Sequence, residues 1–195
     1  MKKAVSILLV VALLSISTSA FAYNYWVNKA KLNGGPKGQE YYTSDEFFDG
    51  RYYGGFVRNA VSDWNKSVIA YPADMTEVAF TESDSRSNTV VDFMIDNYGS
   101  TGWNGVADFF QYGVGQINED GFGPEANYDW SRISLNDTYL NDDDSDDITA
   151  TAKHEFGHSL GLAHSDTKDA IMYKNRDRNT INVESDDVNG VKKLY

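Results

Sequence analysis

All three histidines of the chain lie in one segment, residues 154–164, which reads HEFGHSLGLAH. In a helix of 3.6 residues per turn, His154 and His158 project from one face and can bind the same metal ion. Gly161 can adopt a positive φ without penalty, so the helix can end there and the chain can bring His164 to that ion. Three nitrogen ligands leave a fourth tetrahedral position for water, which is typical of a catalytic zinc site. The spacing therefore predicts Zn²⁺ bound by His154, His158 and His164.

Glu155 is the residue that could use such an ion. It stands one step round the same helix from His154, so its carboxylate can lean over the ion without binding it. A general base for a metal-bound water occupies that position. We therefore interpret Glu155 as the catalytic base. The alternatives are ordinary polar helix residues or a metal site without chemistry, but the full pattern recurs by accident far less often than a bare H-E-x-x-H.

The pattern H-E-x-x-H-x-x-G-x-x-H is the signature of the metzincin metalloproteases, and the chain resembles them at a second place. Met172 follows His164 by eight residues, as in the methionine turn of that family. The resemblance implies that Met172 forms a hydrophobic floor beneath the zinc without binding it, a special case of a methionine that fills a gap in a core. Two further positions resemble the matrixin branch: Ser165 after the third histidine, and Lys174 where astacins and serralysins place a tyrosine.

Residues 184–195 resemble the closing helix of matrixin catalytic domains, with paired aspartates and a terminal Leu-Tyr. Ser185 is the predicted N-cap of this helix. The strong resemblance covers residues 147–195, and before that it is limited to the order of elements.

The chain also departs from animal matrixins. No histidine remains for a second, structural zinc, and by coarse alignment Asp108 stands near one of the lost positions. There is no cysteine for a cysteine switch. Lys174 replaces the proline that usually follows Met-Tyr, at the border of the specificity pocket.

The elements that must position these residues follow from apolar periodicity. Apolar residues from Tyr53 to Trp64 recur at helical spacing and predict a helix over residues 50–66 that packs on a sheet. Asp147 is the predicted N-cap of the helix that carries the histidines, which runs to Leu160. The expected fold class is α+β; the matrixin resemblance implies the metzincin fold, a mixed twisted sheet with two long helices, a C-terminal helix and an edge strand above the zinc cleft. Strands are predicted over residues 25–32, 77–81, 89–95, 105–112 and 131–135, with a loop over 34–38.

The first residues predict export. A basic start, an apolar run over residues 4–14 and the sequence Ala20-Phe21-Ala22 are typical of a signal peptide, residues 1–22, ahead of one catalytic domain, residues 23–195. The apolar run is too short for a membrane helix, which needs about 20 residues. We therefore expect a secreted, extracellular monomer without a membrane anchor.

The chain is strongly acidic. Its formal net charge is −12, and loss of Lys2 and Lys3 with the signal peptide makes it −14. This charge argues against binding to nucleic acid. It suits Ca²⁺ as a structural ion, because calcium prefers oxygen ligands. Candidate calcium ligands lie in residues 142–147 and 118–123, although neither segment matches an EF-hand and either could be a solvated acidic loop.

These features predict a secreted zinc metalloendopeptidase that hydrolyses proteins or peptides, with the substrate extended along residues 105–110. One alternative is a zinc-binding extracellular adhesion module without turnover, against which the intact Glu155 argues. The other is a metal hydrolase of non-peptide substrates, against which Ser165, Met172 and the closing helix argue.

Overall fold

The computed structural model describes residues 22–44, 47–68, 77–118 and 123–195. The predicted signal peptide, except Ala22, therefore lies outside the described residues, as do residues 119–122 of one candidate calcium loop. Within the described ranges, no helix is long and apolar enough to cross a membrane.

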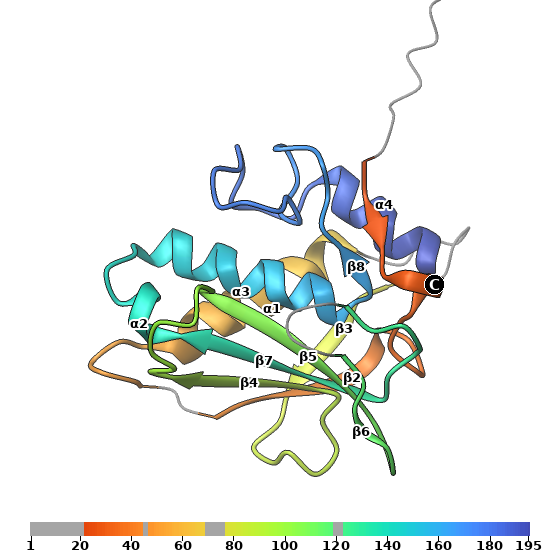
Figure 1. Ribbon diagram of the computed structural model, residues 1–195, viewed down its shortest axis with the longest axis horizontal. Coiled ribbons are helices and arrows are strands. Elements are labelled where there is room, and N and C mark those ends of the chain that lie inside the picture. Colours follow the sequence, from red (N-terminus) through yellow and green to blue (C-terminus); the bar gives the residue numbers. More distant parts are fainter. Residues whose placement is uncertain (1–21, 45–46, 69–76, 119–122) are drawn as a thin grey trace, which may run out of the picture.

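A mixed sheet of six strands forms the base of the fold (Figure 1). The spatial order is β3-β2-β4-β7-β5-β6. Strands β3, β2, β4 and β7 run parallel, and β5 runs antiparallel to β7 and to β6. A second sheet pairs β1 (Asn24–Tyr25) with β8 (Leu162–Ala163). The strands of the large sheet are β2 (Lys37–Thr43), β3 (Ala79–Glu82), β4 (Val91–Asp96), β5 (Gly105–Gln111), β6 (Gly115–Gln116) and β7 (Trp130–Asn136).

Two long helices, α1 (Tyr53–Ser67) and α3 (Ser145–Ser159), lie side by side on one face of this sheet (Figure 1). The indole Nε1 of Trp64 on α1 donates to the carbonyl of Lys153 on α3 at 2.9 Å, which ties the two helices together. The short helix α2 (Asp137–Leu140) leads into α3, and α4 (Ser185–Leu194) closes the chain. A 3₁₀ turn, η1 (Val27–Lys29), precedes β2. The predicted α+β class, with a mixed sheet, two long helices and a C-terminal helix, is confirmed.

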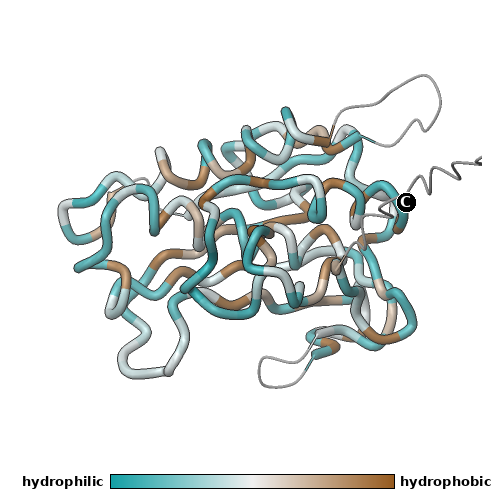
Figure 2. The backbone as a smooth tube through the Cα atoms, turned by 90° about the horizontal axis from the view of Figure 1, so that it is seen from above, coloured by the Kyte–Doolittle hydropathy of each residue, from teal (hydrophilic) through white to brown (hydrophobic). Residues whose placement is uncertain are grey.

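The core lies between the helices and the sheet. The predicted apolar stripe of α1 is buried, with Tyr53, Val57 and Trp64 at 0% exposure. Phe156 of α3 stacks on Phe93 of β4 with ring centroids 6.0 Å apart. Hydrophobic and hydrophilic residues alternate along much of the backbone, as amphipathic elements around one core require (Figure 2).

The prediction of a first strand over residues 25–32 is wrong. Asn28 and Lys29 have φ of 58° and 54°, so the chain turns there instead of extending. The first strand of the large sheet is β2, which overlaps the predicted loop over residues 34–38 and pairs with β3 and β4 on its two sides. Once β2 takes the place of the predicted strand over residues 25–32, the order of the long helices and strands along the chain is the expected one.

Both predicted helix caps are displaced. The N-cap of α3 is Asp144, whose carboxylate accepts from the backbone N–H groups of Asp146 and Asp147, so Asp147 lies inside the helix. The N-cap of α4 is Glu184, which forms a capping box with Asp187, so Ser185 is the first helical residue. In α3 the predicted cap lies three residues after the true one, and in α4 it lies one residue after the true one.

Gly161 ends α3 with a φ of +93°, as the sequence predicts. A Cβ at this position would lie 2.5 Å from Leu194 Cδ2 and 3.3 Å from the carbonyl oxygen of Ala30. We expect Gly161→Ala to lower the free energy of unfolding by about 1–3 kcal/mol from the backbone conformation alone, with a further cost from these contacts. Chemical denaturation measures the change.

The matched control is Gly113→Ala. Gly113 also has a positive φ, +77°, but a Cβ there would meet nothing within 4 Å. The Gly161 variant should therefore be the less stable of the two. Equal stability of the two variants would show that the contacts around Gly161 do not matter.

Candidate metal centre

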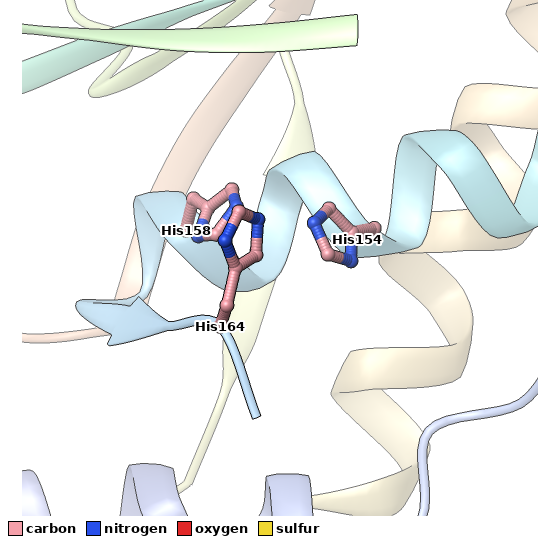
Figure 3. A group of neighbouring side chains, drawn as sticks. All are labelled: His154, His158 and His164. Atoms are coloured by element: carbon pink, nitrogen blue, oxygen red, sulfur yellow. The ribbon is translucent and has the colours of Figure 1, made fainter. Parts of the chain in front are cut away.

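The three histidines converge on one point. His154 and His158 project from α3, and His164 rises toward them from the segment after β8 (Figure 3). One ligand atom from each of the three lies within 4.8 Å of the others. Within the described ranges, this is the group of His, Cys, Asp or Glu side chains that could hold a metal ion. The turn at Gly161 is what allows the third histidine to reach the other two.

The hydrogen bonds of His154 and His158 favour metal binding through the ring nitrogen that they leave free. His154 Nδ1 lies 2.8 Å from the carbonyl oxygen of Ile171, and His158 Nδ1 lies 2.8 Å from that of Leu162. A carbonyl only accepts, so each Nδ1 carries the proton and each Nε2 keeps a free lone pair. Burial lowers the pKa of His154 well below its usual value, that of His158 to about 3, and also that of His164. Three neutral imidazoles are a donor set that fits Zn²⁺.

Glu155 is buried beside this cluster, on the side of β5. A Cβ at Gly105, the first residue of β5, would lie 2.7 Å from Glu155 Cγ and 3.1 Å from Glu155 Oε1. The glycine therefore leaves the space that the carboxylate fills. Burial raises the pKa of Glu155 to about 8, and the positive charge of Arg178 acts in the opposite direction. A carboxylate with raised proton affinity in a cleft is a candidate general base.

Met172 lies beneath the helix that carries two of the histidines. Its side chain is 1% exposed, and a Cβ at Gly157 of α3 would lie 2.2 Å from Met172 Sδ. Ser165, next to the third histidine, donates its backbone N–H to the carbonyl of Met172 at 2.7 Å. The methionine turn, residues 170–173, is therefore bound both to α3 and to the segment of His164, as expected for a floor.

The paired aspartates of α4 hold this turn in place, a role that their position in the sequence does not reveal. Asp187 is fully buried and accepts from the backbone N–H groups of Ile171, Met172 and Glu184 at 3.0, 3.1 and 2.8 Å. Burial raises the pKa of Asp187 to about 6, although these three N–H groups favour the carboxylate. Asp186 accepts from the hydroxyl of Ser165 at 3.0 Å and from the backbone N–H of Ala22 at 2.6 Å. The only sequence signal was a pair of acids at a helix start, which indicates capping and no distant partner.

Other predicted ligands are engaged elsewhere. Asp108 pairs with Arg132 at 2.7 Å and accepts from Gln116 at 3.2 Å on the far side of β5 from the core. In the acidic segment 142–147, Asp143 pairs with Arg176 and Asp144 caps α3. The described acidic residues therefore do not show where calcium would bind.

Two cavities flank the histidine cluster. The basic cavity, about 170 Å³, is lined by His154, Glu155, His164 and the loop residues Tyr173–Arg176 and Arg178. The apolar cavity, about 410 Å³, lies along β5 and includes Trp26 and Phe109 in its wall. Trp26 packs on His158 with ring centroids 4.9 Å apart. Lys174 lies in the wall of the basic cavity.

A helix that presents two histidines and a glutamate, a glycine turn to a third histidine, and a buried methionine turn below them together define a metzincin-type metalloprotease site. Comparison with known families agrees with this class: residues 54–195 match the Matrixin family. The chain belongs to the matrixins, which are zinc-dependent metalloendopeptidases. Calcium is typical of the matrix metalloproteinases among them.

Individual relatives come from animals and plants. The chain is 31% identical to neutrophil collagenase of Homo sapiens over 143 residues, which is 71% of this chain and 28% of that protein. It is 34% identical to matrix metalloproteinase-18 of Xenopus laevis over 122 residues, 61% of this chain and 22% of that protein. It is 30% identical to metalloendoproteinase 2-MMP of Arabidopsis thaliana over 151 residues, 71% of this chain and 39% of that protein. In each case the chain spans less than two fifths of the relative.

Removal of the Asp187 carboxylate tests its role under the site. We expect Asp187→Ala to lower the free energy of unfolding by about 1–3 kcal/mol for each buried N–H group left without an acceptor. Asp187→Asn keeps one acceptor oxygen and should lose less. Urea denaturation of both variants measures their free energies of unfolding. Asp142→Ala is the control, because Asp142 is an exposed acidic residue. If Asp187→Ala and Asp142→Ala are equally stable, Asp187 does not hold the turn.

Proposed function

We propose that the chain is a secreted zinc metalloendopeptidase in which His154, His158 and His164 bind zinc and Glu155 is the general base. The observation that carries this proposal is the convergence of three neutral imidazoles beside one buried carboxylate, at the meeting point of two cavities. Membership of the matrixin family supports peptide bonds as the substrate. The alternative of a non-catalytic binding module offers no reason to bury Glu155 next to the cluster.

When bound, Zn²⁺ supplies a Lewis acid that polarises the peptide carbonyl and lowers the pKa of water towards about 7. Glu155 accepts the proton of the water that attacks the carbonyl carbon. The same carboxyl group then returns that proton to the nitrogen of the leaving amine. Burial of Glu155 suits both steps, because a raised pKa makes the carboxylate a stronger base and still lets it release the proton.

The substrate lies extended along the start of β5. Residues Gly105–Phe110 pair with β7 on one edge. On the other edge, β6 pairs at Phe110 and Gln111, and Phe109 is bonded to Ile117 and Asn118, so the part nearest Gly105 has no strand partner among the described residues. The opposite edge near Gly105 borders both cavities. An added peptide strand can therefore form main-chain hydrogen bonds there and direct its side chains into the cavities. Residues 1–22 direct export, residues 23–195 form the catalytic domain, and the enzyme acts outside the cell as a monomer on protein or peptide substrates.

Substitution of Glu155 separates catalysis from metal binding. We expect Glu155→Gln, loaded with zinc, to keep its metal content and fold but to lose about 10²–10⁴-fold in the rate of casein or gelatin digestion. Metal analysis and circular dichroism serve as controls, and a chelator should abolish the wild-type activity. A variant as active as the wild type would exclude Glu155 as the base. A wild type that binds zinc but digests no protein would favour the binding module.

We also propose that calcium stabilises the fold. With a net charge of −12 the folded chain repels itself, and a chain without cysteines has no disulfide to stabilise it. A bound cation would reduce this repulsion. Because it binds the folded state, it would also raise the free energy of unfolding by mass action. Millimolar calcium should raise the melting temperature of zinc-loaded Glu155→Gln protein, which cannot digest itself. Magnesium should do less, because it requires a tighter octahedral site. Coincident melting curves in calcium, magnesium and monovalent salt of equal ionic strength would leave only charge screening.

A further inference from the structure

The basic cavity carries a charge opposite to that of the whole protein. The chain has 29 acidic and 17 basic residues, yet the wall of this cavity includes Lys174, Arg176 and Arg178 against a single carboxylate, that of Glu155. All three basic side chains come from the loop that follows the methionine turn. The cavity adjoins His154 and His164, so in the proposed function it lies beside the bond that is cut.

The three basic residues differ in their partners. Lys174 pairs with Asp166 at 3.3 Å, and Arg176 pairs with Asp143. Arg178 is half-buried and lines the cavity, but it forms no hydrogen bond or ion pair with the described part of the chain. The carboxylates of Asp147, Glu155 and Asp187 attract its charge without bonding to it, so the N–H donors of this partly desolvated guanidinium stay available to a ligand. Its planar fork of N–H donors matches a carboxylate in a bidentate arrangement.

The size of the cavity agrees with one amino-acid side chain as its occupant. Its volume of about 170 Å³ is smaller than the roughly 300–1,000 Å³ of pockets that enclose a drug-sized ligand. We propose that the basic cavity is a specificity pocket for an acidic side chain, Asp or Glu, next to the scissile bond, with Arg178 as the residue that selects the carboxylate. This inference rests on the proposed function, because the acidic residue belongs to a peptide that the enzyme cleaves.

Arg178 also has an electrostatic effect on Glu155, since its charge opposes the rise in the pKa of that carboxyl group. This effect alone would alter the cleavage rate of all peptides equally. A specificity pocket instead alters the ratio between peptides that differ only at one side chain. The two roles are therefore separated by paired substrates.

In the first step, the zinc-loaded wild type digests a peptide library, and mass spectrometry identifies the cleavage sites. We expect Asp and Glu to be enriched at one position adjacent to the cut. Matched peptides with Glu or Gln at that position should then differ in kcat/KM by about tenfold or more, as for a charge-assisted bidentate contact. Arg178→Gln should bring the ratio close to one, and Arg178→Lys, which keeps the charge but loses the fork, should give an intermediate ratio.

Lys66→Gln is the control, because it removes the same charge from an exposed position at the end of α1. It should leave the Glu/Gln ratio unchanged. No enrichment of acidic residues on either side of the cut, or the same ratio in wild type and Arg178→Gln, would overturn the proposal.

A binding measurement keeps the test independent of turnover. Fluorescence anisotropy on zinc-loaded Glu155→Ala protein, with and without Arg178→Gln, should show tighter binding of the Glu peptide only when Arg178 is present. Because Glu155→Ala is common to both proteins, its own effect on the cavity charge cancels. If the wild type cleaves no peptide, the proposed function fails while this difference can still be observed. Equal affinities for the two peptides in the Arg178 protein would refute the acidic pocket.

Discussion

The carboxylate of Asp187 is the constraint on which the site depends. It accepts hydrogen bonds from three backbone N–H groups: those of Ile171 and Met172 in the methionine turn and that of Glu184 at the start of α4. The turn fixed in this way supplies two supports to α3: the carbonyl of Ile171 orients the imidazole of His154, and Met172 fills the space below Gly157. Through the methionine turn, α4 therefore supports α3, which begins 40 residues earlier in the sequence, at Ser145 instead of Ser185. Histidines on one helix face provide ligands, and these hydrogen bonds add a support beneath the helix to its packing on α1 and the sheet.

Electrostatics divides the molecule into two regions. The protein as a whole is negative, with a formal net charge of −12. The cleft contains the buried imidazoles of His154 and His158, whose pKa values burial lowers, and the buried carboxylate of Glu155, whose raised pKa the charge of Arg178 opposes. Low local dielectric strengthens each of these interactions. In the proposed specificity pocket, the acidic side chain of a substrate would therefore be recognised by few groups, at short range, against the field of the rest of the protein.

The extent to which sequence predicts this structure depends on how local each signal is. The histidine segment, the turn at Gly161 and the stripe of α1 are set by spacing within a few residues, and the structure has them where they were expected. The first strand was wrong because positive φ at Asn28 and Lys29 leaves no mark in composition, while β2 follows a glycine-rich stretch typical of a loop. The role of Asp187 and the basic cavity join segments that only the fold brings together, so no local pattern indicates them. The cap of α3 was displaced because five aspartates lie in residues 142–147 and any could cap.

The position of β2 has a consequence for where this family's domain can be cut. The matrixin match begins at residue 54, after β1, η1 and β2. Yet β2 is an interior strand between β3 and β4, and Trp26 stands in the wall of the apolar cavity against His158. A fragment limited to the matched residues would expose two unpaired strand edges and open one side of the cleft to solvent. The segment that matches the family is therefore smaller than the sheet and the cleft wall that the structure shows.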